Sequence, residues 1–320
     1  MLDNGDKLGA FIVPTGVGAS IGGFAGDASV FARELSKKCK LIVNPNVVNA
    51  ACFSGINENM FYVEGYSLDN FFKQKCNLVP SSNNKIGVIF DKSISKRVLN
   101  VHINTINAVK TVYGINVVGY EITDEEVGVE FYVDKSGAST GDVRNLGTIK
   151  SASEKLLKQG ADAIAIVCSF PEDDGEDYAN GVGVDPVGGV EAIISHYISK
   201  ELCVPCAHAP AFENIQISTD IVDSRCSAEY ITPTFLPCIL IGLSQAPRFA
   251  LSGGISVDNL DFLVMPYNSL GGVPVFEAQK RGIPIYGIKE NMTVLDVTKD
   301  KLGVNCILVD SYEQLTEMIQ

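Results

Sequence analysis

Short apolar runs alternate with amphipathic stretches along most of the chain. The amphipathic stretches carry apolar residues at the spacing of one helix face, as in residues 95–113 and 190–200. Strands that alternate with helices of this length predict an α/β fold with mostly parallel, Rossmann-like sheets. The apolar runs with the length of a buried strand include residues 9–13, 41–43, 86–90, 161–168 and 262–265.

The stretch from Lys135 to Gly147 is the best candidate for a domain boundary. It is rich in Gly, Ser, Asp and Asn, which is typical of a connection between folded units. We therefore expect two α/β lobes, residues 1–145 and 146–320, with a central cleft between them. A C-terminal segment that packs back on the first lobe is compatible with this division.

A glycine-rich loop follows the first apolar run and precedes a helical pattern that begins near Asp27. Pro14 ends the run, and five glycines follow within eleven residues. Glycines let backbone N–H groups approach a ligand, and a helix that starts behind them adds a positive dipole end. The loop therefore predicts a site for a phosphate or a carboxylate.

Residues 262–272 repeat this order, with an apolar run, a proline and glycines before the next helix. Two such loops would face each other across a cleft at the carboxyl ends of parallel strands. The expected ligand contacts are Thr15, Gly16, Gly18, Gly22 and Gly23 in the first loop, and Ser269, Gly271 and Gly272 in the second. Three asparagines are candidate donors to the ligand, namely Asn46, Asn49 and Asn291.

The acid–base candidates are two histidines and three carboxylic acids. His196 and Glu191 share the helix expected over residues 190–200, and the glycine-rich stretch 181–189 before it makes a second helix start suited to an anion. His208 stands between alanines at an expected strand end, where a buried structural histidine is an equally good interpretation. The full set is Asp27, Asp185, Glu191, His196 and His208.

The first loop is also close to a dinucleotide-binding fingerprint. Its glycines are Gly16, Gly18, Gly22 and Gly23, whereas the fingerprint requires an acidic residue after the second strand to hold a ribose. Here that strand ends in Asn44. An NAD(P)-dependent oxidoreductase is therefore an alternative, and so is a loop whose glycines serve tight packing alone.

Neither the cysteines nor the acidic run of the chain predicts a metal site. Cys203 and Cys206 have a two-residue spacing near His208, but zinc usually takes four protein ligands, or three and a water. The acidic run 172–177 has oxygen ligands suited to Mg²⁺ or Ca²⁺, although a solvated loop is the favoured interpretation. We assign no metal ligand and leave the cofactor undetermined.

The strand that ends in Cys168 resembles the second-cysteine strand of aspartate/glutamate-type racemases. Those enzymes pair two thiols across the substrate, and the partner here would be Cys52. The Asn-Thr pair that normally follows the first thiol is absent, and no histidine follows Cys168. A racemase-like isomerase is therefore kept as an alternative.

Charge and cysteine usage narrow the class of protein. The 320 residues carry a net charge of −13, which argues against a nucleic-acid surface. We find no 18-residue apolar span and no charged-then-apolar leader, so we expect neither a membrane-spanning nor a secreted protein. Nine cysteines, mostly in apolar runs, fit reduced thiols. We expect a cytoplasmic protein with a small-molecule ligand and no nucleic-acid or membrane partner; its oligomeric state is open, a homo-oligomer included.

Several longer strings are specific enough to suggest a family. They include Ile12-Val-Pro-Thr-Gly-Val-Gly18, Ile21-Gly-Gly-Phe-Ala-Gly-Asp-Ala28, Pro45-Asn-Val-Val-Asn49, Pro205-Cys-Ala-His-Ala-Pro210 and Phe235-Leu-Pro-Cys-Ile-Leu-Ile-Gly-Leu-Ser244. With them the chain resembles an uncharacterised family, number 3326 among the catalogued domains of unknown function, found mostly in oxygenic photosynthetic microbes. The resemblance covers nearly the whole chain and implies no activity, because the family has no established reaction.

The interpretation that joins these features is an enzyme of unknown reaction. It would bind a small polar or anionic metabolite in the cleft between the lobes, using the glycine-rich loops and the acid–base residues. A non-catalytic binding or regulatory protein is the alternative from a different class. The enzyme is favoured if His196 or His208 faces the cleft beside Asp185 or Glu191.

Overall fold

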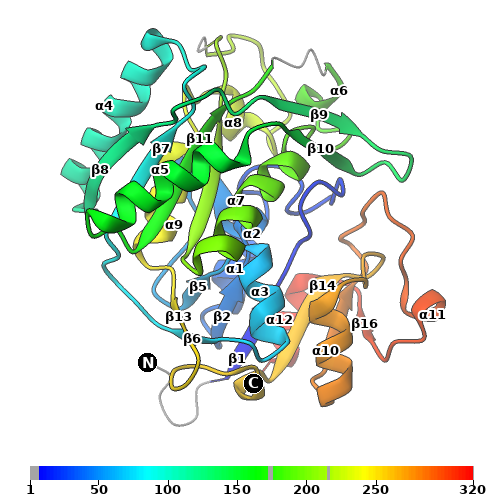
Figure 1. Cartoon of the computed structure of the whole chain (residues 1–320). Coiled ribbons are helices and arrows are strands. Elements are labelled where there is room, and N and C mark those ends of the chain that lie inside the picture. The colour runs from blue at the N-terminus through cyan, green and yellow to red at the C-terminus, as the bar shows by residue number, and fades with distance from the viewer. Residues whose placement is uncertain (1–6, 172–175, 215–216, 320) are drawn as a thin grey trace.

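The computed structural model describes residues 7–171, 176–214 and 217–319 and contains two parallel sheets (Figure 1). Every neighbouring pair of strands within these two sheets is parallel, which confirms the α/β fold. In order, the six-stranded sheet holds β16 (Ile307–Val309), β15 (Ile285–Ile288), β14 (Phe262–Pro266), β1 (Leu8–Phe11), β2 (Lys40–Val43) and β5 (Met60–Tyr62). The four-stranded sheet holds β12 (Cys206–Ala211), β11 (Ala163–Ser169), β7 (Ile86–Phe90) and β8 (Val117–Ile122).

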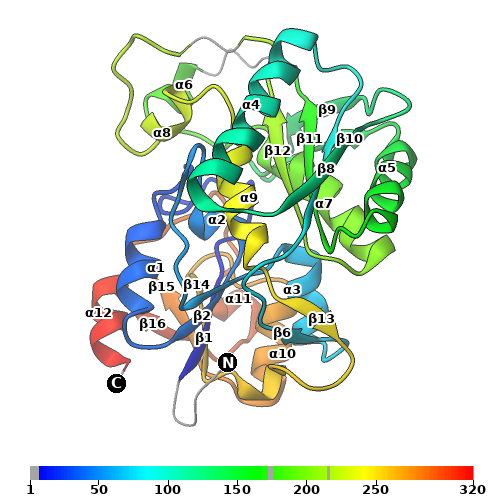
Figure 2. The ribbon, with the colours of Figure 1, turned by 90° about the vertical axis from the view of Figure 1, so that its left-hand side faces the viewer.

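Each sheet and its helices form one lobe, and the two lobes lie one above the other (Figure 2). The first lobe carries α1 (Ser29–Leu35), α2 (Pro45–Val48), α3 (Gly65–Phe72), α10 (Val273–Arg281), α11 (Lys299–Leu302) and α12 (Tyr312–Met318). The second lobe carries α4 (Lys96–Tyr113), α5 (Leu146–Lys158), α6 (Glu176–Ala179), α7 (Gly188–Leu202), α8 (Ser227–Tyr230) and α9 (Leu236–Ser244). A short 3₁₀ helix, η1, spans Val257–Asn259.

The chain forms the first lobe from its two ends and the second lobe from its middle. It leaves the first lobe at β6 (Asn77–Val79) and returns at β13 (Arg248–Ala250), and these two crossings pair with each other as antiparallel strands. The expected boundary near residue 145 lies between β8 and β11 of one sheet, so the sheets do not divide there. The segment that packs back on the first lobe supplies β14, β15 and β16.

Two hairpins complete the strands. β3 (Asn49–Ala50) and β4 (Phe53–Ser54) form a minimal pair after α2, and β9 (Val129–Val133) pairs with β10 (Ser139–Val143) in the second lobe. β10 and β9 both contact α7. The segment from Lys135 to Gly147, expected to be a connection between domains, therefore contains half of a hairpin that packs on the second lobe.

The boundaries of α4 show how the sequence determines a helix. Ser95 accepts a hydrogen bond from the backbone N–H of Val98 through Oγ and caps the first turn, while Gly114 ends the helix in the left-handed region. Val98, His102, Ile106 and Val109 recur at helical spacing and are its buried side chains. The helix expected over residues 95–113 is thereby confirmed.

The hydrophobic core is continuous between the lobes. In β11, residues 163–168 are all buried, as expected for a parallel strand covered on both faces. α9 contacts α4 and β11 of the second lobe and also β3 and β4 of the first. One cluster of buried side chains joins α9, α4 and β11 with β1, β2 and β14 of the first lobe. Within the described ranges, no helix is both long and apolar enough to cross a membrane.

Candidate functional site

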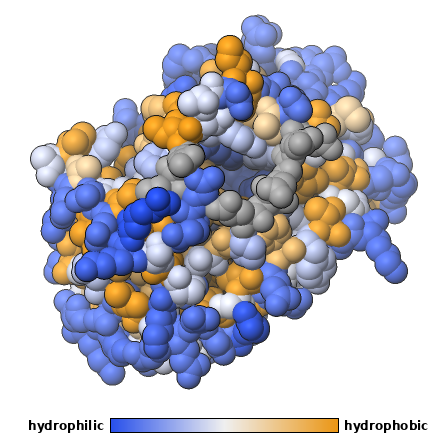
Figure 3. All heavy atoms as spheres, turned by 90° about the horizontal axis from the view of Figure 1, so that it is seen from above, coloured by the Kyte–Doolittle hydropathy of each residue, from blue (hydrophilic) through white to orange (hydrophobic). Residues whose placement is uncertain are grey.

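A cavity of about 620 Å³ lies where the two lobes meet. Thr15 follows β1, Pro45 and Asn46 follow β2, and Phe212 follows β12, so the cavity lies at the carboxyl ends of strands from both sheets. The face of the molecule seen from above is hollowed, and the surface visible inside the hollow is hydrophilic (Figure 3). This position is the one at which open α/β sheets commonly bind ligands.

His208 and Glu191 meet in the wall of the cavity. His208 comes from β12 and Glu191 from the first turn of α7, and Nε2 of His208 lies 3.8 Å from Oε2 of Glu191. Nδ1 of His208 lies 2.8 Å from Oγ of Ser195, one turn further along the same helix. The imidazole therefore lies against two side chains that the helix places on one face.

We assign the tautomer of His208 from the hydrogen bonds of Ser195. The single hydroxyl proton of Ser195 is donated to the carbonyl of Ala192 at 3.3 Å, which leaves Oγ to accept from Nδ1–H of His208. Nε2 then carries the free lone pair and faces Glu191. A distance of 3.8 Å is too long for a direct hydrogen bond between them.

Burial shifts the pKa of both members of this pair in the direction that favours the uncharged form. Desolvation, with the nearby His196 as a second cause, lowers the pKa of His208 to about 3, so the imidazole is neutral at pH 7. Desolvation raises the pKa of Glu191 well above its usual range, and the carboxyl groups of Asp185 and Glu229 add to the increase. Oε1 of Glu191 is buried without a hydrogen-bond partner in the described structure.

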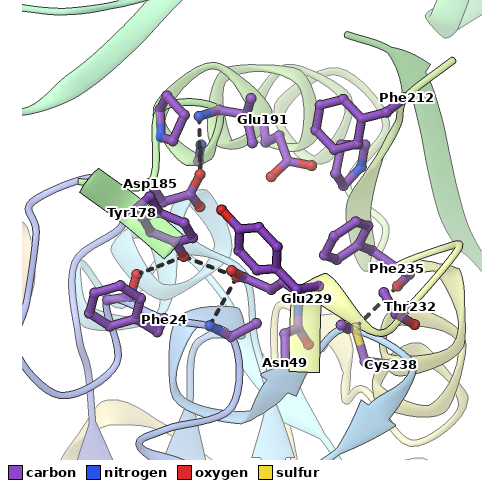
Figure 4. A pocket seen from close by; sticks show the side chains of 18 of the residues that line it. Phe24, Asn49, Tyr178, Asp185, Glu191, Phe212, Glu229, Thr232, Phe235 and Cys238 are labelled. Carbon is purple, nitrogen blue, oxygen red and sulfur yellow. Dashed lines mark hydrogen bonds between the residues drawn. The ribbon is translucent and has the colours of Figure 1, made fainter. Parts of the chain in front are cut away.

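Three further carboxyl groups line the same cavity, those of Asp185, Asp220 and Glu229. Asp185 accepts hydrogen bonds through Oδ1 from the backbone N–H groups of Val187 and Gly188, at 3.1 and 3.2 Å, where α7 begins. Glu229 on α8 accepts through Oε1 from Ala25 N–H at 3.1 Å and from the hydroxyl of Tyr178 at 3.0 Å. Figure 4 shows Asp185, Glu191 and Glu229 arranged around one space.

Burial also raises the pKa of Asp185 and of Glu229. Burial raises the pKa of Asp185 against the opposing effect of its two backbone hydrogen bonds. Burial raises the pKa of Glu229 to about 8, and the charge of Asp185 contributes in the same direction. No lysine or arginine is found among the described residues of the cavity wall. The anion expected from the glycine loops would therefore meet carboxyl groups without a balancing cation.

Aromatic rings form much of the remaining wall. Phe212 and Phe235 lie opposite Tyr178 in Figure 4, and their rings are 6.3 Å apart in an edge-to-face arrangement. Phe24 and Tyr178 stack at 4.9 Å on the other side. The cavity thus combines four carboxyl groups, that of Asp220 included, with flat apolar surfaces.

The structure brings together eight of the residues singled out from the sequence. They include both expected ligand contacts and expected acid–base residues. Glu191 and His208 are in contact with each other, and the other residues lie around them. The eight are Thr15, Gly22, Gly23, Asn46, Asn49, Asp185, Glu191 and His208.

His196 and Asp27 lie outside the lining of the cavity. Nε2 of His196 lies 3.4 Å from Oε2 of Glu64, the N-cap of α3. Oδ1 of Asp27 accepts from Gly22 N–H at 2.6 Å, and burial raises the pKa of Asp27 to about 7. Asp27 therefore holds the glycine loop that lines the cavity through its hydrogen bond to Gly22.

Gly16 and Gly18 serve the packing of the first loop. Gly16 has φ +70°, and a Cβ there would collide with Oγ of Ser139 on the β9–β10 hairpin. A Cβ on Gly18 would press on Val184 and Val294. The two glycines most characteristic of a dinucleotide fingerprint thus face protein atoms.

Asn44 and Asn291 hold the same loop in place. Asn44 accepts from Val13 N–H at 3.0 Å and donates to Val13 O at 2.7 Å, so it links the ends of β1 and β2 at the position where the fingerprint requires an acidic residue. Asn291 accepts from Ile21 N–H at 3.0 Å and donates to Ile21 O at 2.7 Å and to the hydroxyl of Tyr312 at 2.7 Å. Asn291 is completely buried and lies outside the cavity lining.

The second glycine loop is covered by residues 293–297. Asn268 donates to Thr293 O at 2.9 Å and to Leu295 O at 2.7 Å, and Leu270 N–H donates to Val297 O at 2.8 Å. β1 and β14 are neighbours in one sheet, so both loops leave the same edge, but the loop residues named from the sequence lie outside the cavity lining. They are Ser269, Gly271 and Gly272.

The thiols named for redox, metal or racemase chemistry are also outside the lining. Cys168 and Cys206 are buried, Cys203 is exposed and Cys52 is partly buried. In the described ranges, no group of three or more His, Cys, Asp or Glu side chains is arranged to hold a metal ion. Of the acidic run 172–177, residues 172–175 lie outside the described residues.

Four functional positions were not identified from the sequence. Ser195 has a local signal, because it lies four residues after Glu191 and therefore on the same helix face. Tyr178, Glu229 and Phe212 have none, since they stand in short helices or loops without periodicity. Their positions depend on how segments far apart in the chain meet at the cavity.

Comparison with known proteins places the chain in a family. A family model described as "Protein of unknown function (DUF3326)" matches residues 9–319. An uncharacterized lipoprotein of Synechococcus sp. is 39% identical over 303 residues, which cover 92% of this chain and 84% of the relative. No solved structure matches the chain. The family resemblance expected from the sequence strings is confirmed, and the chain belongs to the DUF3326 family of proteins of unknown function.

Proposed function

We propose that the chain is an enzyme that transfers protons on a small polar metabolite bound in the cavity between the lobes. Glu191 and His208 are its acid–base pair. The observation that carries the proposal is the position of this pair, 3.8 Å apart in the cavity wall, with Oε1 of Glu191 buried and without a partner in the described structure.

The two groups have complementary roles in a proton transfer. Protonated Glu191 donates a proton to the substrate, and the neutral Nε2 of His208 accepts one from it. Donation leaves a carboxylate 3.8 Å from Nε2, and a negative charge at that distance favours the imidazolium. The two events therefore support each other, and the pair as a whole neither gains nor loses a proton. Ser195 positions the imidazole by holding Nδ1–H.

Isosteric variants of the pair test the proposal. We would incubate the wild type, Glu191→Gln and His208→Gln with a metabolite extract and follow the composition by mass spectrometry. The wild type should convert at least one metabolite, and each variant should be slower by roughly 100-fold or more. His196→Gln, on the same helix but paired with Glu64, is the matched control and should retain the activity.

The same experiment separates the enzyme from a non-catalytic binding protein. A wild type that binds a metabolite without converting any would contradict the catalytic proposal and favour a binding or regulatory role. The oxidoreductase alternative predicts stabilisation by NAD(P) in a thermal-shift measurement. The racemase alternative predicts equal loss of activity in Cys52→Ser and Cys168→Ser, although both thiols lie outside the cavity lining.

We also propose that the protein acts in the cytoplasm. All nine cysteines are free thiols, which suits a reducing compartment. Cell fractionation with an antibody to the chain tests this proposal. The relative described as a lipoprotein makes the membrane fraction the outcome that would contradict it.

A further inference from the structure

Three carboxyl groups of the chain converge on one cavity from three separate segments. Asp185 comes from the turn before α7, Glu191 from α7 and Glu229 from α8. They are close enough for the charge of Asp185 to act on both glutamates, and for Glu229 to act on Glu191. Burying carboxyl groups so close together costs free energy unless a ligand offsets that cost with hydrogen-bond donors or a positive charge.

One carboxyl oxygen of the cluster, Oε1 of Glu191, has no group that offsets the cost of its burial. Oε1 of Glu191 is buried and has no hydrogen-bond partner in the described structure, and the residue is only 7% exposed. Asp185 and Glu229 both accept hydrogen bonds through one oxygen, from backbone N–H groups and from Tyr178. Glu191 is therefore the carboxyl group left for a donor that the protein itself does not supply.

The cationic side chains near the cavity are already engaged. Arg225 donates to Asp223 and to Gly181 O and lies 4.8 Å over the ring of Phe24. Arg225 itself lies outside the cavity lining, and no arginine or lysine stands in the described cavity wall. The net charge of −13 adds an attractive potential for cations over the whole molecule.

We propose that the ligand of this cavity carries a protonated amine, and that Glu191 and Glu229 bind its nitrogen. An ammonium group donates three hydrogen bonds, which suits carboxyl oxygens on two sides. The rings of Phe212 and Phe235 cover the carbon chain of the ligand and supply π faces for the charge. The inference rests on the proposed function, because it names the substrate class of the same cavity.

Amine binding should release protons and should therefore depend on pH. An ammonium group beside protonated Glu229 favours ionisation of that carboxyl, so binding should release protons to the solvent. The affinity for an amine should accordingly rise with pH through about 8, the pKa to which burial raises Glu229. The ionisable groups that act on Glu229 or respond to it are Tyr178, Asp185, Glu191, Cys226 and Asp27.

Three probes of equal length test the charge that the cavity accepts. They are 1,4-diaminobutane, 1,4-butanediol and butanedioate, used with the full-length protein in thermal-shift and calorimetric titrations. We expect the diamine alone to stabilise the protein. The heat of diamine binding should differ between phosphate and Tris buffer, and the sign of the difference should correspond to protons released by the protein. Glu229→Gln should weaken the diamine by about tenfold or more, whereas Glu213→Gln, an exposed glutamate close in sequence to Phe212, should not.

Each outcome separates this inference from the proposed function. If the diol or the dianion binds and a series of two- to six-carbon amines does not, the inference is overturned, even when metabolite conversion is observed. If Mg²⁺ or Ca²⁺ displaces the diamine and stabilises the protein more strongly, the carboxyl groups form a metal site and the inference also fails. Amine binding with proton release, in a protein that converts no metabolite, supports the inference and contradicts the catalytic proposal alone.

Discussion

Nε2 of His208 lies 3.8 Å from Oε2 of Glu191; burial lowers the pKa of His208 to about 3 and raises the pKa of Glu191 well above its usual range. The pair is held by two elements of the second lobe, β12 and α7. On the other side of the imidazole, Ser195 accepts the Nδ1 proton. The arrangement determines which atom of each side chain faces the cavity and leads to the first prediction.

Ser195→Ala should release His208 from its single tautomer. The substitution leaves a buried Nδ1–H without an acceptor, which costs about 1–3 kcal/mol in the free energy of unfolding. ¹⁵N NMR of the imidazole should show a mixture of tautomers in place of the Nδ1–H form. Ser151→Ala is the matched control, because Ser151 makes a similar hydroxyl-to-carbonyl bond within an exposed helix face. An unchanged ring spectrum in Ser195→Ala would contradict the positioning role.

Stability should fall as pH rises from about 4.5 to about 8, and Glu229→Gln should reduce this fall. The folded-state pKa of Glu229 is raised from 4.5 to about 8, so its contribution is fully present below 4.5 and is lost as pH passes through 8. Between pH 5 and pH 8.5, the free energy of unfolding of the variant should fall by roughly 1–3 kcal/mol less than that of the wild type. Urea unfolding at several pH values measures this difference, and parallel curves for both proteins would count against a buried neutral Glu229.

His208 should act in the opposite direction at acid pH. Its folded-state pKa is lowered from 6.5 to about 3, so the stability it contributes is present above pH 6.5 and is lost as pH falls toward 3. His208→Gln should therefore flatten the acid side of the stability curve between pH 6.5 and 4.5. The exposed His196 supplies the control variant, and equal slopes for His196→Gln and His208→Gln would refute the assignment.

Asn44→Asp should destabilise the protein without creating a dinucleotide site. The new carboxylate would face Val13 O, to which Asn44 now donates at 2.7 Å in a buried position. The lost donor and the repulsion should cost on the order of 3 kcal/mol. Asn145→Asp, at an exposed amide-to-carbonyl bond, should cost much less. A gain of NAD(P) binding, measured by thermal shift, would instead support the dinucleotide interpretation of the loop.

Gly16→Ala should cost more than its backbone conformation alone explains. Gly114 has nearly the same φ, +67° against +70°, but a Cβ there meets no atom within 4 Å. Gly114→Ala should therefore cost about 1–2 kcal/mol for the left-handed backbone. In Gly16→Ala the new Cβ also collides with Ser139, which should lower the free energy of unfolding by about 1–3 kcal/mol more. Equal losses of unfolding free energy would show that the loop does not depend on its contact with the hairpin.

Local pattern was sufficient for α4 and for most strands of the two parallel sheets, and it found half of the residues singled out for the site. The spacing of Val98, His102 and Ile106, with Ser95 before and Gly114 after, defines α4 through periodicity and capping alone. Thr15 and Asn46 could be placed at the cavity because residues that follow parallel strands meet at one edge of a sheet. Glu191 and His208 were recognised by residue type, although no local feature showed that they are neighbours.

The tertiary structure decided which glycines line the cavity and which charged groups surround it. Gly16 and Gly18 look the same as Gly22 and Gly23 in the sequence, but the hairpin β9–β10 and the segment around Val294 cover the first two. Glu229 comes from a short helix 38 positions after Glu191, and only the packing of both lobes places it in the same cavity. Sequence periodicity reports which face of an element is buried; it does not report which faces of different elements meet, because that depends on contacts between residues far apart in the chain.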